Sequence, residues 1–295
     1  MSRFVHIHVE EEGLRVDKLL ASSLEELTRS AVQNLIEEGR VTCCGRPLTK
    51  SAKLKAGEEI QIELPEVRPL EVLPEDIPLD IPYEDEDLLV VNKPPGIPVH
   101  PSPGHPQGTL ANGLAWYFQQ KGEPFVFHCV NRLDRDTSGL LIAALHPLSA
   151  SLLSGNMAKR KISRTYRALA EGQTDAFGTI RAPIGRKPGS IIQRQIDPEH
   201  GAPAVTHYRT LAWGEGFSYI ELHLETGRTH QIRVHMASIG HPLLGDSLYH
   251  PDSAFPMARQ ALHSFALEFT HPITEKAMRF TAPLPLDMQA WLNRA

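Results

Sequence analysis

The amino-acid sequence predicts an α+β protein of two units joined by a linker. Helical spacing and strand alternation both occur within residues 1–66, whereas residues 83–295 contain many short apolar runs separated by long loops. Between them, at residues 67–82, lies a stretch rich in proline and acidic residues, which interrupts helices and removes strand donors. A chain of 295 residues is long enough for two ordinary domains. We therefore expect two folded units on either side of this linker.

The first unit contains two predicted helices and a few strands. Apolar residues at helical spacing predict one helix around residues 16–20 and a second that begins near Thr28 and ends at Gly39. A short strand and turn follow in RVTCCGRPL, where Gly45 suits a tight bend. The alternating segment EEIQIEL at residues 58–64 predicts a half-buried strand.

The second unit is predicted to have strands with long loops between them. Residues 87–92 (DLLVVN) form an apolar run of strand length, and residues 108–118 have helical periodicity. A polar loop, NRLDRDTSG at residues 131–139, leads into the apolar strand LLIAAL. Loops that are held in this way by a buried strand often carry catalytic groups.

Charge and cysteine content restrict the class of protein. The net charge is −5, but bases dominate between Lys159 and Arg194, and such a patch either faces solvent or holds a polyanion locally. The sequence has neither a secretory signal nor an apolar run of about 18 residues, the length that spans a membrane. Its three cysteines form no Cys-x-x-Cys pair, which is typical of a reducing compartment. We expect a cytoplasmic protein.

Two nucleotide-binding motifs and the common zinc spacing are absent. The chain has no G-x-x-x-x-G-K-[ST] or G-x-G-x-x-G loop, which argues against nucleotide use. His230 and His235 are five residues apart, a spacing that does not place both on one helical face, so we expect no metal site. Asp134 and Asp136 remain open to three interpretations: an acid–base pair, magnesium ligands, or structural partners of neighbouring arginines.

The segment N-R-L-D-R-D-T-S-G-L-L resembles the H-R-L-D-x-x-T-S-G-L-L signature of the RluA/RluD family of pseudouridine synthases. Residues 83–101, 164–172, 226–249 and 261–272 resemble further motifs of that family in the same order, so the likeness covers essentially the whole chain. It implies a catalytic domain with a mixed, largely antiparallel sheet, flanking helices and a basic cleft. It also implies an isomerase that converts uridine in structured RNA to pseudouridine without a cofactor.

The same resemblance implies three catalytic residues. Asp134 matches the family's aspartate, which attacks the ribosyl group or promotes proton removal from the ribose. Arg233 matches the basic residue that keeps this carboxylate ionised. Tyr166 matches the active-site tyrosine, whose ring stacks on the base.

Three further residues are implied to bind the substrate. Arg132 matches the arginine that takes the place of the flipped nucleotide or holds its phosphate. Arg228 and Lys93 are candidates for contacts with RNA phosphate. The chain departs from the family at Asn131, where the family usually has His. Because Asn131 lies beside the chemistry, this departure bears on substrate choice or rate rather than on reaction type.

The pattern R-x-D-K-L-L, then L-T-R-S-x-x-Q-x-L-I-x-x-G-x-V and K-A-G-E-E-I, resembles the small α+β RNA-binding module first known from ribosomal small-subunit protein four. The likeness covers most of residues 13–64. In that family the second helix and the loop after it lie against RNA. The basic residues that we expect to contact RNA are Arg15, Lys18, Arg29, Arg40 and Arg46.

The resemblance favours large-subunit ribosomal RNA as the substrate, with transfer RNA, or both, as the alternative, and a monomer as the default state. A non-catalytic RNA-binding factor for ribosome assembly is the rival function. It would be indicated by an Asp134 displaced from Arg233, or by a filled cleft. A nucleoside or glycoside hydrolase is a third interpretation, and it needs a second acid facing Asp134, from Asp136 or Asp246.

Overall fold

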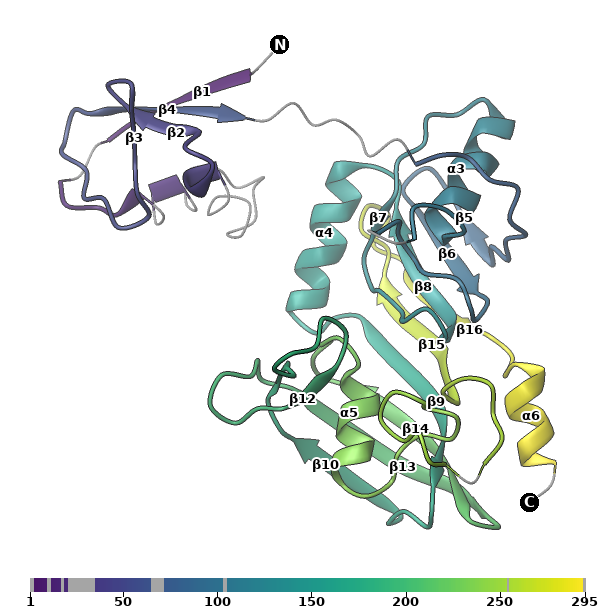
Figure 1. Cartoon of the computed structure of the whole chain (residues 1–295). Helices are drawn as coiled ribbons and strands as arrows, with labels where there is room; N and C mark the ends of the chain where they lie inside the picture. Colours follow the sequence, from purple (N-terminus) through teal and green to yellow (C-terminus); the bar gives the residue numbers. More distant parts are fainter. Residues whose placement is uncertain are drawn as a thin grey trace. The chain divides into compact units, whose positions relative to one another are not determined.

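The chain forms two compact units, Met1–Glu71 and Val72–Ala295 (Figure 1). The computed structural model describes residues 3–9, 12–16, 19–20, 35–64, 72–102, 105–253 and 255–293. Part of the stretch expected as linker packs on the second unit. The Asn112 amide donates a hydrogen bond of 2.8 Å to the Leu73 carbonyl, and Leu79 contacts the core. The folded chain of the second unit therefore begins before residue 83.

The first unit contains a four-stranded antiparallel sheet in the order β1-β4-β2-β3. Its strands are β1 (Arg3–His8), β2 (Val41–Cys43), β3 (Arg46–Pro47) and β4 (Glu59–Leu64). The predicted alternation is confirmed in β4, where Ile60 and Ile62 are fully buried. They share an apolar core with described residues of the two predicted helices: Val16, Leu20, Leu35 and Ile36.

Local backbone conformations in the first unit follow the predicted turn residues. Gly39 has a left-handed φ of 71° and ends the second helix. The N–H groups of Gly39 and Arg40 donate to carbonyls of the last helical turn, which is the Schellman arrangement. Cys44 and Gly45, with φ of 50° and 73°, form the two-residue turn between β2 and β3, as in a type I′ hairpin. The predicted start of the second helix at Thr28 lies outside the described residues.

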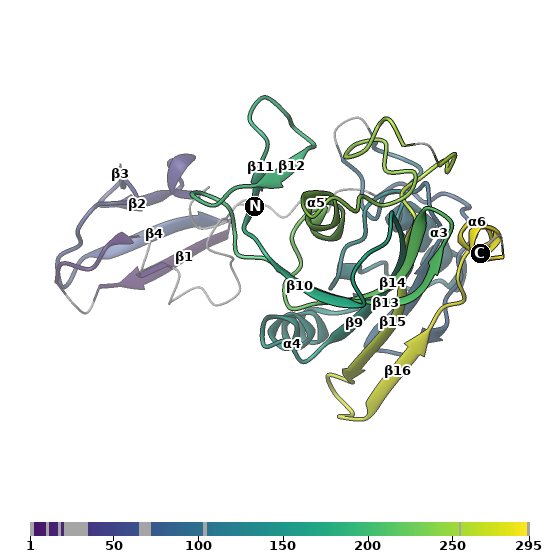
Figure 2. The same ribbon diagram turned by 90° about the horizontal axis from the view of Figure 1, so that it is seen from below.

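The second unit is built on a ten-stranded sheet (Figure 2). Eight strands follow the order β10-β13-β14-β9-β15-β8-β6-β5, while β16 pairs with β15 and β7 with β8. Within the described part of the chain, β8 and β15 are parallel and the other neighbouring strands are antiparallel. The expectation of a mixed, largely antiparallel sheet is therefore confirmed.

The bounds of these strands are β5 (Tyr83–Glu84), β6 (Leu88–Lys93), β7 (His128–Cys129), β8 (Ser138–Ala144), β9 (Ser163–Glu171), β10 (Phe177–Arg181), β13 (Val205–Gly214), β14 (Phe217–Leu224), β15 (Leu262–Thr270) and β16 (Ala277–Thr281). A separate two-stranded hairpin consists of β11 (Ile184–Arg186) and β12 (Arg194–Ile196). Along the chain, the hairpin lies between β10 and β13, which pair directly with each other in the main sheet.

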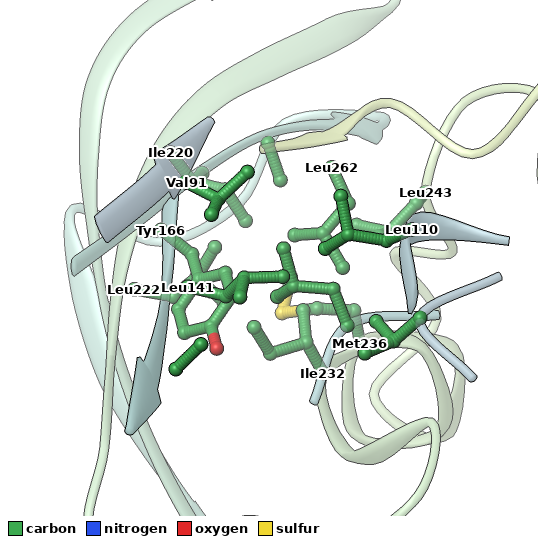
Figure 3. Close-up of a cluster of buried hydrophobic side chains, with 14 of the residues drawn as sticks. Val91, Leu110, Leu141, Tyr166, Ile220, Leu222, Ile232, Met236, Leu243 and Leu262 are labelled. Carbon is green, nitrogen blue, oxygen red and sulfur yellow. The ribbon is translucent and has the colours of Figure 1, made fainter. Parts of the chain in front are cut away.

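Helices cover both faces of this sheet. They are α3 (Leu110–Lys121), α4 (Pro147–Ala158), α5 (Gln231–Ser238) and α6 (Leu286–Leu292). On β6, Leu89 and Val91 belong to one apolar cluster with α3 and α5, whereas Leu88 and Val90 belong to another with α4. Because both faces are buried, this strand is apolar throughout rather than alternating. Figure 3 shows part of the first cluster, with the ring of Tyr166 at one side.

No helix in the described ranges has the length and apolar character needed to cross a membrane.

Candidate active site

Asp134 lies in the loop between β7 and β8, and a glycine determines where this loop ends. The Thr137 N–H donates to the Asp134 carbonyl at 3.1 Å and closes a tight turn. Gly139 follows with φ of 105°, and a Cβ atom there would lie 2.2 Å from the Ser264 carbonyl oxygen of β15. Glycine is therefore required for β8 to pair in parallel with β15 at this point.

Lys93 holds the Asp134 loop from behind. Its ammonium group donates to the carbonyls of Pro94, Ile97 and Arg135 at 2.7, 2.9 and 2.8 Å. The side chain is fully buried, and burial lowers the pKa of Lys93 to about 7. The structure does not support the expectation that Lys93 contacts RNA phosphate, because backbone carbonyls enclose its charged end. Its role here is to fix the loop.

Asn131, at the position where the family usually has His, fastens the start of the same loop. Its Oδ1 accepts from the Ile142 N–H at 2.8 Å, and its Nδ2 donates to the Leu140 carbonyl at 3.4 Å. The buried amide thus pairs with β8 much as a strand backbone would. Asn131 therefore extends the short strand β7 toward Asp134.

Asp134 is paired with Arg233 of α5, as the family resemblance implies. The Arg233 Nη1 group donates to Asp134 Oδ2 at 3.1 Å, and the arginine is 7% exposed. Its Nε and Nη2 groups donate to the two carboxylate oxygens of buried Asp246, both at 2.7 Å. Burial alone would lower the pKa of Arg233, but Asp246 and Asp134 together raise it. The guanidinium beside Asp134 is therefore a permanent cation.

His230 and Tyr249 complete the surroundings of this ion pair. His230 Nε2 lies 3.8 Å from Asp134 Oδ2, and its Nδ1 shares a 2.8 Å hydrogen bond with the Tyr249 hydroxyl. The Arg233 guanidinium lies 5.1 Å from the centre of the Tyr249 ring. Burial lowers the pKa of His230, so at neutral pH the ring is uncharged and Arg233 is the cation. Both residues lie within the T-G-R-T-H-Q-I-R…L-Y motif, but its spacing assigned them no role.

A cavity of about 950 Å³ opens beside Asp134. Tyr166 reaches it from β9 with 5% of its surface exposed, and burial raises the pKa of its hydroxyl, so the ring is neutral. A second cavity of about 50 Å³ shares part of the same wall and is also lined by His230 and Arg233. The three predicted catalytic residues, distant in sequence, therefore meet at one place.

Several arginines line the larger cavity: Arg132, Arg160, Arg164 and Arg228. The structure thus brings the predicted Arg132 and Arg228 to the site. It adds Arg164, whose Nε is buried without a hydrogen-bond partner. A Cβ atom on Gly227 would lie 2.9 Å from Arg164 Nη1, so this glycine leaves room for the guanidinium. Arg160 is paired with Glu225 at 2.6 Å, whereas the other three arginines form no ion pair with a described residue and suit a ligand that carries phosphate.

The two candidates for a second catalytic acid do not face Asp134. Asp136 is paired with Arg135 at 3.0 Å, and Asp246 is occupied by Arg233. Neither aspartate lines either of the two cavities. The interpretation of Asp134 and Asp136 as an acid–base pair is therefore not supported, and neither is the hydrolase that depends on such a pair.

Asp85, Asp87 and His271 are a cluster of potential metal ligands away from the cavity. His271 Nδ1 accepts from the N–H groups of Ile273 and Thr274 at 3.3 and 3.0 Å. Its Nε2 must then carry the proton and donate it to Asp85 at 2.8 Å. With both ring nitrogens engaged, His271 has no lone pair for a metal. The cluster is a structural hydrogen-bond network.

The basic residues predicted to contact RNA in the first unit have different surroundings. Arg15 and Arg46 are exposed. Arg40 is half-buried and donates to Glu38 at 2.8 Å. Lys18 and Arg29 lie outside the described residues.

Comparisons with known proteins agree with this geometry. The family described as RNA pseudouridylate synthase matches residues 87–238, and the S4 domain matches residues 14–60. In solved structures, human RNA pseudouridylate synthase domain containing 1 is similar, with a TM-score of 0.57 and 28% identity over 71% of this chain and 84% of that chain.

Relatives similar in sequence extend over nearly the whole chain. The uncharacterized RNA pseudouridine synthase YlyB of Bacillus subtilis is 42% identical over 95% of this chain and 93% of its own. Ribosomal large subunit pseudouridine synthase D of Escherichia coli O6:H1 is 39% identical over 94% of this chain and 89% of its own. The chain therefore belongs to the family of RNA pseudouridine synthases, isomerases that convert uridine in RNA to pseudouridine.

Proposed function

We propose that this enzyme modifies uridines in large-subunit ribosomal RNA and that Asp134 is its catalytic carboxylate. The observation that carries the assignment is the ion pair of Asp134 with Arg233 at the wall of an open cavity beside Tyr166. A displaced aspartate or a filled cavity would have favoured a non-catalytic RNA-binding factor. Neither is present at this site, so we favour catalysis by these residues.

The proposed chemistry follows from the contacts of Asp134. The carboxylate attacks the ribosyl group of a flipped uridine or promotes proton removal from the ribose, and either route breaks the bond between C1′ and N1. The uracil then turns and rejoins C1′ through its carbon 5, which loses a proton while N1 gains one. Arg233 keeps the carboxylate ionised in a half-buried site, and the Tyr166 ring offers an apolar face to the base. Arg132, Arg164 and Arg228 are proposed to hold the neighbouring phosphates.

The choice of ribosomal RNA rests on relatives rather than on the cavity. Similar proteins in several bacteria bear the name ribosomal large subunit pseudouridine synthase D, and an S4 domain precedes the catalytic unit here. Transfer RNA is the alternative substrate, alone or in addition. We further propose that the protein acts as a cytoplasmic monomer. Its three cysteines, all within the described residues, are free thiols, which fits a reducing compartment.

The test compares RNA from cells that carry the wild-type protein, Asp134→Asn or Asp136→Asn as a matched control from the same loop. Pseudouridines are mapped by carbodiimide labelling and primer extension on ribosomal and transfer RNA. We expect specific marks in large-subunit RNA that disappear with Asp134→Asn and persist with Asp136→Asn. Marks confined to transfer RNA would correct the substrate, and marks that survive Asp134→Asn would refute the role of this carboxylate.

A further inference from the structure

The hairpin formed by β11 and β12 has no part in the proposed chemistry, yet its tip is unusual. Ile191 and Ile192, between the two strands, are 84% and 63% exposed. Figure 2 shows the hairpin standing out from the body of the second unit beside α5. Two adjacent aliphatic side chains at the end of a projecting hairpin contribute nothing to the core. Contiguous exposed apolar side chains that are rimmed by polar residues are a feature of sites that contact another molecule.

The charge around this tip indicates which kind of molecule it contacts. Arg186 and Lys187 on the outgoing side are exposed, and Arg194 on the returning side is half-exposed. No acidic residue occurs between Arg181 and Ile196. The partner must offer apolar faces to the two isoleucines and, next to them, anionic groups to the basic residues. Unstacked bases joined by phosphates have this combination, and RNA is the substrate of this family.

The hairpin is fixed to the candidate active site through both of its strands. The Arg194 N–H donates to the Tyr249 hydroxyl at 2.9 Å, and that hydroxyl is bonded to His230 beside Asp134. On the other side, Ile184 pairs with Ala202, and the next residue, Pro203, accepts from the Arg228 side chain of the cavity wall at 3.1 Å. A ligand on the hairpin would therefore be held in a defined position relative to the cavity.

We propose that this hairpin is a second RNA contact, in which Ile191 and Ile192 pack against unstacked bases of the folded substrate while Arg186 and Lys187 hold its phosphates. The proposal rests on the proposed function and adds to it a site for the structure around the target uridine. Aliphatic side chains inserted between bases hold a nucleic acid in a distorted form. The hairpin thus selects folded RNA that can present such bases.

The test uses the full-length protein with both isoleucines replaced, Ile191→Ser/Ile192→Ser, and an unmodified transcript of large-subunit ribosomal RNA that contains the mapped uridine. The matched control is Ile273→Ser, which replaces a 44% exposed isoleucine at the turn between β15 and β16. We expect kcat/KM of the double variant to fall roughly a hundredfold, because the burial of each isoleucine contributes a factor of about ten. The kcat at saturating RNA and the thermal unfolding temperature should stay at wild-type values.

Titrations with the same transcript over a range of salt separate the two kinds of contact. The isoleucine variant should raise Kd equally at all salt concentrations, whereas Arg186→Gln/Lys187→Gln should reduce the slope of log Kd against log salt by about 0.7–0.9 per lost phosphate contact. An isoleucine variant with wild-type kcat/KM and Kd would overturn the proposal and assign the tip to a different partner. If the wild-type enzyme modifies no uridine in the transcript, the proposed substrate fails. The Kd comparison still decides whether the hairpin binds RNA.

Discussion

Replacing Gly139 with alanine tests whether the glycine of the T-S-G sequence builds the active-site loop. The substitution has two separate costs. A φ of 105° is strained for any residue with a Cβ atom, at about 1–3 kcal/mol. The new atom would also lie 2.2, 2.7 and 2.8 Å from backbone atoms of Ser264, which cannot rotate away. Overpacking of this kind costs about 1–3 kcal/mol or more. We expect Gly139→Ala to lower the free energy of unfolding by about 4 kcal/mol, a large share of the stability of a typical domain.

The matched control is Gly240→Ala, because Gly240 has φ of 83° but a Cβ atom added there would meet no other atom within 4 Å. It should cost only the strain, about 1–2 kcal/mol. Urea unfolding followed by tryptophan fluorescence reports on the second unit, since Trp116, Trp213 and Trp291 all belong to it. If Gly139→Ala destabilises the protein no more than Gly240→Ala, the close approach of β8 and β15 is not what requires glycine. Residual folded protein should also have lost activity, because Asp134 is displaced.

Three further changes test the supports around Asp134. Asp246→Asn leaves a buried guanidinium poorly paired and should lower the free energy of unfolding by about 3–5 kcal/mol, measured by urea titration. Burial lowers the pKa of Lys93 to about 7, whereas the pKa in the unfolded chain is about 10.4. Between about pH 7 and about pH 10.4 the unfolded state therefore binds more protons than the folded state, and the free energy of unfolding rises with pH. The difference in the free energy of unfolding between the wild type and Lys93→Met should therefore increase by about 2 kcal/mol from pH 7 to pH 9. A difference that stays the same over this pH range would contradict the buried, neutral lysine. Asn131→Ala leaves the buried Ile142 N–H without a partner and should cost about 1–3 kcal/mol, with kcat falling more than KM rises in RNA kinetics.

The active-site residues that could be predicted from the sequence are those that lie within a recognisable family motif. Asp134, Tyr166 and Arg233 each lie in a string long enough to be matched to a family, and all three line the smaller of the two cavities. Strand and helix positions followed from apolar spacing, as in β6 and α3, because burial on one or both faces leaves a direct pattern in the sequence.

Lys93 shows why other roles did not follow from the sequence. A lysine before two prolines, next to a glycine loop, has the composition of an exposed phosphate contact. Its burial depends on carbonyls of Ile97 and Arg135, and the second of these is distant in sequence. The role of Asp246 was hidden for the same reason, since only the folded chain brings it to Arg233. The spacing of residues in the sequence predicts which side chains share one face of a helix or strand. The contacts of Lys93 and Asp246 join different elements, so spacing did not predict them.

The two carboxylates around Arg233 are held differently, and this difference bears on the proposed role of Asp134. Asp246 takes the Nε and Nη2 groups of the guanidinium, so its orientation is fixed and Nη1 is the group directed at Asp134. That single bond reaches Oδ2 only, and no hydrogen bond from a described residue reaches Oδ1. A carboxylate held at one oxygen keeps the other available to a ligand, whereas a bidentate pair with Arg233 would occupy both. Asp246 thus takes the bidentate pairing with Arg233, and Asp134 keeps one oxygen without a hydrogen bond from the described residues.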